Sequence, residues 1–308
     1  MTVLTSTANI GSSVIAAYDR VAHFALRAGA VFDQQARFKA GSLTNPGSSE
    51  KFLFYDDLSP VTAALTETSD VDAVGLSDSL VTITPAEHGN AVKVTLKLRT
   101  QSLSLGFDAD VANIVAYNMV DSVETIAREA LDASGTAVVV DGGNATDLTA
   151  ADTLTMSFIR RQVQTLRGQS VLPLNGNDYA VTIHPDVAFD LMEETVGNSW
   201  TDLKHTSAGA LMSGELGRFA GAVFLESPRA KVEADGGSGS VDNYSTYVTG
   251  QDALGKSEQI AVHIVPGPIT DTLMRFMPLG WYGIFGYGEI RSAATRRIIS
   301  ASSIGSNT

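Results

Sequence analysis

The segment FDADVANIVAYNMVDSVETIAREALDAS, residues 107–134, is the longest helical pattern in the chain, and it contains neither glycine nor proline. Its apolar residues recur at intervals of three and four, which aligns them along one face of a helix. At about 1.5 Å per residue this helix would be about 40 Å long, the width of a compact domain. We call it the spine helix. A core helix of an ordinary α+β enzyme would show the same pattern, so the flanking segments decide the fold.

The composition describes a folded chain with few surface charges for its size. Of the 308 residues, 44% are hydrophobic and 18% are charged, and the formal net charge is -13. Low charge together with 28 glycines indicates that much of the surface is interface. Because phosphate neutralisation needs clustered Lys and Arg, the acidity argues against a protein that grips nucleic acid over its whole surface. It does not exclude a protein that encloses DNA.

Upstream of the spine helix, short regular elements alternate with polar connectors. Ser12–Ala28 has the apolar spacing of a short amphipathic helix, and residues 29–51 form a connector rich in Gly, Ser and Asn. Two predicted strands, KFLFYDDL (51–58) and LVTIT (80–84), enclose a long polar excursion. The alternating segment AVKVTLKL (91–98) predicts a half-buried strand that leads into the spine helix.

The excursion between the two strands is acidic. From Phe52 to Val92 there is no Lys or Arg, whereas seven residues are negatively charged: Asp56, Asp57, Glu67, Asp70, Asp72, Asp78 and Glu87. Such a run is either a solvated flap or a strap that lies on a basic surface of another molecule. A predicted helix at 151–168 offers one landing site for the strap, with Arg160, Arg161 and Arg167 on its outward face.

Downstream of the spine helix, strands and helices alternate. The pattern predicts strands at 137–140 and 179–183, a helix at 184–194, a long loop at 195–212, and a helical turn within GELGRFAG (214–221) followed by a strand at 222–226. The last part predicts strands within 244–250, 259–265, 274–290 and 294–301.

No motif in the sequence indicates catalysis. The patterns GxSxG, HExxH and GxxxxGKS/T are absent, and the five histidines show no helical ligand spacing. The turn DGGNATD does not match the spacing of an EF-hand loop, and the chain has no cysteine. We therefore expect no catalytic, cofactor-binding or metal-binding residues and no enzymatic activity. Without an 18-residue apolar run or an export signal, we also expect a soluble protein.

The order of these parts, together with three segments, resembles one known family. VTIHPDVAFDLM (181–192), GELGRFAGAVFLES (214–227) and LGWYGIFGYGEIR (279–291) look like counterparts of signature stretches in tailed-bacteriophage major capsid proteins with the Hong Kong 97-like fold. None of the three is a catalytic motif, so the resemblance rests on their order and spacing over nearly the whole chain. It implies an α+β fold and a structural protein.

The resemblance also implies a division into four parts and a set of partners. The parts are an N-terminal arm (1–47), an extended loop (48–88), a peripheral domain (89–135 and 273–308) with the spine helix, and an axial domain (136–272). Subunits of this kind assemble into pentamers and hexamers, which form an icosahedral head shell around double-stranded DNA without sequence-specific binding. The expected location is the virion, after assembly in the host bacterial cytoplasm. Further expected partners are adjacent capsomers, a portal, and separate scaffolding and decoration proteins, with no membrane.

In this family the extended loop lies across the neighbouring subunit, which would make the acidic strap an intersubunit clamp. We hypothesise that Asp56, Asp57, Glu67, Asp70 and Asp72 meet basic residues of a neighbour, among them Arg160, Arg161 or Arg167. The type member of the family links a Lys of this loop to an Asn of the next subunit. Residues 52–92 contain no Lys, so that isopeptide bond cannot come from this loop. We also expect no fused scaffolding segment, because only about 50 residues precede the extended loop.

Two other interpretations stay open. An encapsulin, a bacterial nanocompartment shell protein, has the same fold and would differ by a bound cargo peptide and the absence of a packaged genome. A secreted β-rich hydrolase or glycan-binding protein would share the glycine, threonine and aromatic content. A signal peptide or a clustered carboxylate pair would favour that second interpretation, and the sequence shows neither.

Overall fold

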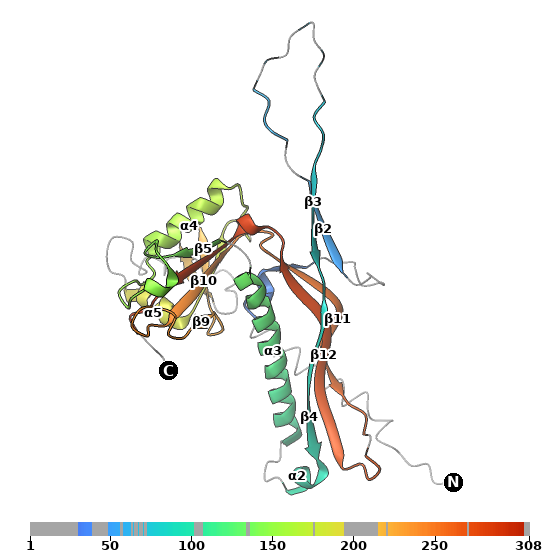
Figure 1. Cartoon of the computed structure of the whole chain (residues 1–308). Coiled ribbons are helices and arrows are strands. Elements are labelled where there is room, and N and C mark those ends of the chain that lie inside the picture. Colours follow the sequence, from blue (N-terminus) through green and yellow to red (C-terminus); the bar gives the residue numbers. More distant parts are fainter. Residues whose placement is uncertain are drawn as a thin grey trace.

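The computed structural model describes residues 30–38, 49–55, 58–62, 64, 67, 70, 73–101, 107–133, 136–174, 176–193, 215–219, 221–269 and 271–304. Within these ranges the chain forms two large sheets, with the spine helix beside both, and a projecting two-stranded hairpin (Figure 1). The predicted helix Ser12–Ala28 and the predicted loop at 195–212 lie outside the described residues.

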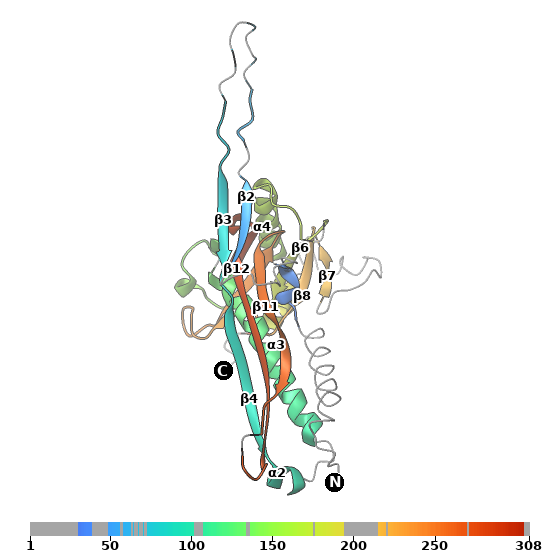
Figure 2. The same cartoon turned by 90° about the vertical axis from the view of Figure 1, so that its right-hand side faces the viewer.

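The spine helix α3 (Phe107–Ala133) packs along a four-stranded sheet, which confirms the helix that the apolar spacing predicts (Figures 1 and 2). In spatial order the strands of this sheet are β1 (Ala36–Phe38), β11 (Leu254–Pro266), β12 (Phe276–Glu289) and β4 (Ala86–Thr95). The first pair is parallel and the other two pairs are antiparallel. The buried contact between helix and sheet is made by Ala112, Val115, Ala116, Met119, Val123, Ile264, Leu279, Trp281 and Phe285.

A seven-stranded sheet forms the second body. Its main path is β5 (Thr136–Val139), β13 (Thr295–Ser300), β10 (Asn243–Thr249), β6 (Tyr179–Ile183), β8 (Ala222–Glu226) and β7 (Glu215–Phe219), and β9 (Val232–Glu233) pairs with β10. Every residue of β6 and β10 is buried. Helices α4 (Met156–Gly168) and α5 (Pro185–Glu193) contribute to the same core. Short 3₁₀ turns lie at Asp33–Gln35, Ala145–Asp147 and Ser292–Ala294.

The hairpin of β2 (Glu50–Tyr55) and β3 (Asp78–Ile83) confirms the two strands that were predicted around the acidic excursion. Its base joins the body where Phe52, Ile83 and Ile290 are buried together. Figures 1 and 2 show the hairpin, and the described part of the segment between its strands, projecting away from both sheets. The outer part of the hairpin therefore lies apart from both cores.

Three predictions of secondary structure are wrong. Residues 29–51 are not one connector, because Asp33–Gln35 form a 3₁₀ turn, Ala36–Phe38 form strand β1 and strand β2 begins at Glu50. Residues 91–98 do not form one strand, because β4 ends at Thr95 and helix α2 (Leu96–Gln101) follows. The Thr95 hydroxyl accepts a hydrogen bond from the backbone N–H of Leu98 at 3.2 Å, which is the geometry of a helix N-cap. Residues 215–219 form strand β7 and not a helical turn, because they pair antiparallel with β8 across a tight turn in which Gly221 has φ 81°.

The strand pairing also crosses the predicted domain boundaries. Strand β11, which the boundary at 272 assigns to the axial domain, pairs with β12 and β1 in the four-stranded sheet. Strand β13, which the range 273–308 assigns to the peripheral domain, pairs with β10 and β5 in the seven-stranded sheet. The chain thus passes between the two bodies from β10 to β11 and back again from β12 to β13.

The orientation of the spine helix leads to a matched pair of stability predictions. Met119 is 1% exposed in the contact with the sheet, so Met119→Ala should lower the free energy of unfolding by about 3 kcal/mol. Ile114 on the same helix is 64% exposed, so Ile114→Ala should change it by less than about 0.5 kcal/mol. Urea unfolding followed by circular dichroism measures both, and equal losses would contradict this orientation.

Candidate assembly surfaces

The extended loop, residues 48–88, presents apolar side chains to solvent along its length. Tyr55, Val61, Val74 and Leu76 are 71%, 81%, 72% and 75% exposed, and further exposed residues of the loop are Leu53, Leu58 and Leu80. Monomeric proteins rarely leave a large continuous apolar surface in water. These exposed side chains make the loop a candidate surface for contact with another molecule.

The acidic residues that were predicted to meet a neighbour belong to the same loop. Glu67 and Asp70 are exposed, whereas Asp56, Asp57 and Asp72 lie outside the described residues. The loop thus combines exposed apolar side chains with exposed negative charge.

The three arginines that were predicted as their partners lie on α4. Arg160, Arg161 and Arg167 are all exposed, and the guanidinium carbon of Arg167 lies 5.9 Å from the centre of the Tyr179 ring. Figure 1 shows α4 beside the seven-stranded sheet, while the extended loop projects beyond it. Glu67, Asp70 and the three arginines are thus exposed, and pairing between the acidic and basic sets of two chains stays a prediction.

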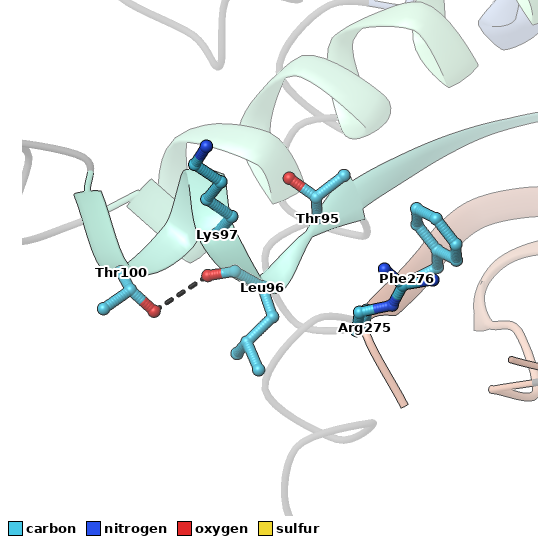
Figure 3. A pocket seen from close by; sticks show the side chains of 6 residues that line it. All are labelled: Thr95, Leu96, Lys97, Thr100, Arg275 and Phe276. Carbon is cyan, nitrogen blue, oxygen red and sulfur yellow. Dashed lines mark hydrogen bonds between the residues drawn. The ribbon is translucent and has the colours of Figure 1, made fainter. Parts of the chain in front are cut away.

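At the end of the four-stranded sheet that lies far from the β2–β3 hairpin, α2 and the connection between β11 and β12 form an open pocket of about 570 Å³ (Figure 3). The Thr100 hydroxyl donates a hydrogen bond to the Leu96 carbonyl oxygen at 2.8 Å. Arg275 is held by Asp271 at 3.2 Å, and its guanidinium carbon lies 5.5 Å from the centre of the Phe276 ring. The residues that line the pocket are Thr95, Leu96, Lys97, Thr100, Arg275 and Phe276.

This pocket has the character of a contact surface. Among the described residues that line it, the charged ones are Lys97 and Arg275, and none carries a carboxylate or imidazole for proton transfer near neutral pH. Close to it along the chain, Leu98, Leu273 and Met274 are 53%, 69% and 66% exposed. The sequence analysis missed this surface because it placed Leu98 on the apolar face of a strand.

A buried carboxylate joins the spine helix to the segment that precedes β1. Glu124 is 0% exposed, and its Oε2 and Oε1 accept the backbone N–H groups of Phe32 at 3.0 Å and Asp33 at 3.1 Å. The Asp33 carboxylate binds the ammonium of Lys256 at 2.9 Å and accepts a hydrogen bond from the Tyr287 hydroxyl. This network was not predicted from the sequence. A signal for it exists there, because Glu124 interrupts the apolar face of the spine helix.

Burial and charge set the protonation of this network. Burial raises the pKa of the Glu124 carboxyl above its ordinary value. The hydrogen bonds that the carboxylate accepts from backbone N–H groups oppose this shift. Burial alone would lower the pKa of Lys256, but the carboxylates of Asp33 and Glu258 raise it on balance, so the ammonium stays charged. Burial and the Asp33 charge raise the pKa of Tyr287, which keeps its hydroxyl available as a donor.

The raised pKa of Glu124 predicts a pH dependence with a definite sign. Its contribution to stability is fully present below the unfolded-state pKa and is lost as the pH rises through the raised folded-state pKa. Glu124→Gln removes this titration. The free energy of unfolding of the wild type minus that of Glu124→Gln should therefore increase as the pH falls from neutral to about 4. Urea titrations at several pH values measure the difference, and a value constant with pH would refute the raised pKa.

Within the part of the chain that the structure describes, other site types are not supported. No described helix combines the length and hydrophobicity that a membrane crossing requires. No three His, Asp or Glu side chains of the described residues stand close enough together to hold a metal ion. The features that stand out are the extended loop, the open pocket near α2 and the buried network around Glu124.

Solved structures match most of this chain, although no protein-family model and no curated protein matches its sequence. The capsid of Ralstonia phage GP4 has a TM-score of 0.73 at 12% identity, over 90% of this chain and 92% of that one. The cyanophage Pam1 capsid has a TM-score of 0.67 at 13% identity, over 87% and 88%. The head of Helicobacter pylori bacteriophage KHP40 has a TM-score of 0.63 at 12% identity, over 90% and 89%.

These matches establish the fold. The chain has the α+β, Hong Kong 97-like fold of phage capsid proteins, which confirms the fold that the sequence resemblance implied. At 12–13% identity the likeness concerns the fold, so the function is argued from the surfaces of this chain.

Proposed function

We propose that this chain is a major capsid protein that self-assembles into pentamers and hexamers and forms the icosahedral head shell around phage double-stranded DNA. The observation that carries the proposal is the extended loop, which projects from both cores and leaves side chains such as Val61 81% exposed. The phage capsids that share the fold support it. The protein would act in the virion as a structural, non-enzymatic component, after assembly in the host bacterial cytoplasm.

The domains of this proposed shell subunit follow the strand pairing. The peripheral domain would contain the four-stranded sheet with α2 and α3, and the axial domain the seven-stranded sheet with α4 and α5. The N-terminal arm (1–47) and the extended loop (48–88) would keep their bounds, except that β1 and residues 86–88 of β4 belong to the four-stranded sheet. The extended loop of one subunit would lie across the neighbouring subunit.

Burial and interlocking, and not a cross-link from residues 52–92, would hold the shell together. Residues 52–92 contain no Lys, whereas the exposed apolar residues of the loop offer a surface to bury. Separate scaffolding, decoration and portal proteins would complete the particle. The net charge of -13 is consistent with a shell that encloses DNA without binding it tightly.

Size-exclusion chromatography and negative-stain microscopy of the purified protein test the proposal. We expect rings of five or six subunits, or closed shells. A protein that remains monomeric at high concentration, also in the presence of a scaffolding protein, would overturn the proposal.

The apolar part of the loop leads to a prediction about assembly. Val61→Ser with Leu76→Ser should leave the free energy of unfolding within about 0.5 kcal/mol, because both side chains are exposed in one chain. The same double variant should raise the protein concentration needed for assembly by about a hundredfold, because burial of each of the two apolar side chains contributes about 1.5 kcal/mol. Light scattering against concentration measures this, with Thr62→Ser as the control in the same loop.

The charged part of the loop leads to a separate prediction. Asp70→Lys with Asp72→Lys should weaken assembly, since it places positive charge opposite the arginines of α4. Replacing Arg160 and Arg161 by Glu in the same protein should restore assembly. Light scattering at low and high salt measures both steps, because screening should reduce the difference. Assembly of the Lys variant at the wild-type concentration would exclude the clamp.

A further inference from the structure

Residues 30–38, which we call the arm base, are joined to two strands of the four-stranded sheet. Within the arm base, β1 pairs parallel with β11, with Ala36 opposite Leu254. Asp33 binds Lys256 of β11 at 2.9 Å and accepts a hydrogen bond from Tyr287 of β12. These contacts fix the arm base to one edge of this sheet.

The arm base is also joined to two strands of the seven-stranded sheet. Gln35 is 3% exposed, and its Nε2 donates a hydrogen bond to Thr182 Oγ1 of β6 at 2.7 Å. The Oε1 of the same side chain accepts a hydrogen bond from Thr249 Oγ1 of β10 at 2.8 Å. Phe32 packs edge-on against Tyr247 of β10, with ring centres 5.5 Å apart. One buried amide thus bridges two strands of the second body.

The spine helix provides the third contact. Glu124 accepts two backbone N–H groups of the arm base, as described above. Apolar packing tolerates small displacements, whereas hydrogen bonds require a direction as well as a distance. Glu124 and Gln35 therefore hold the arm base in one orientation. Around them, the arm base, the helix and both sheets share one apolar cluster, made of Phe32, Ala127, Leu131, Ala230, Tyr247 and Leu254.

The two bodies are also joined directly through the spine helix. Arg229 Nε binds the Asp121 carboxylate at 2.6 Å, and the Tyr247 hydroxyl donates a hydrogen bond to Asp132. The chain also crosses between the two bodies from β10 to β11 and from β12 to β13. Through Gln35 and Asp33 the arm base adds bonds to both sheets at further points, so it restricts their relative motion.

We propose that Glu124 and Gln35 are positioning residues for assembly, because they hold the arm base as a wedge that sets the angle between the two sheets. The link to assembly rests on the proposed function, whereas the angle within one chain does not depend on it. The arm base continues directly into residues 1–29 of the arm. A force that a neighbouring subunit exerts on the arm would therefore be transmitted to the arm base and would change the angle between the two sheets.

Two spin labels measure the angle, because the chain has no cysteine of its own. Asn113→Cys on α3 and Gln164→Cys on α4 place labels at exposed positions of the two bodies. Labelled protein is diluted with unlabelled protein, so that pairs within one chain dominate the electron-electron distance measurement. We expect one narrow distance distribution for the parent, and a shifted and broadened one for Glu124→Ala and for Gln35→Ala.

Matched controls separate positioning from a general loss of stability. Met119→Ala destabilises the core away from the wedge, and Glu129→Gln changes an exposed carboxylate on the same helix, so both should keep the parent distribution. Hydrogen exchange at the amides of Phe32 and Asp33 should accelerate in Glu124→Ala. If these amides are released while the distance distribution stays unchanged, the wedge does not set the angle and the proposal is overturned. If Glu124→Ala does not fold, an unchanged distance distribution in Gln35→Ala overturns the proposal instead.

The link to assembly has its own readout. Particles formed by Glu124→Ala or Gln35→Ala should be irregular in size under conditions where the parent forms uniform ones. Uniform particles from both variants would show that Glu124 and Gln35 are not positioning residues for assembly. A parent protein that never assembles would contradict the proposed function, while the distance measurement on the single chain would still decide whether the wedge exists.

Discussion

The packing of the spine helix against β12 and β11 is the contact on which the rest of the structure depends. Apolar packing brings the helix to the sheet, and a polar contact sets its position along the strand, because the Trp281 indole N–H donates to Asn118 Oδ1 at 2.9 Å. Asn118 Oδ1 also accepts a hydrogen bond from Asn90 of β4 at 3.1 Å. With helix and sheet fixed to each other, the hairpin at one end and α2 at the other can project without needing a core of their own.

Sequence periodicity predicts those elements whose environment changes regularly along the chain. The spine helix is such an element, and its predicted range of 107–134 differs from the observed Phe107–Ala133 by one residue. Periodicity fails where a short segment satisfies two patterns. Leu96 and Leu98 alternate as in a strand, yet the Thr95 cap starts a helix there, and residues 215–219 became a strand because β8 supplies hydrogen-bond partners.

Contacts between distant parts of the chain set the features that the sequence could not show. β13 joins the seven-stranded sheet because it finds edges of β10 and β5 there, and no local pattern encodes that choice. The candidate assembly surface likewise combines features that the sequence shows with features that only the structure shows. The charges of Glu67 and Asp70 are visible in the sequence, whereas the exposure of Val61 and Leu76 appears only once the cores are known to lie elsewhere. Association through such apolar surfaces is driven largely by entropy near room temperature.

The arm base has a consequence for the order of folding. Its partner Tyr287 lies 254 residues after Asp33 in the chain, and its pairing partners in β11 begin at Leu254. The arm base is synthesised long before these partners, so all of its contacts can form only after β12 has been synthesised. Fragments that end before β11 therefore cannot form the junction between the two sheets. A segment made early in synthesis is thus fixed late, so a docked arm base reports that β10, β11 and β12 are in place.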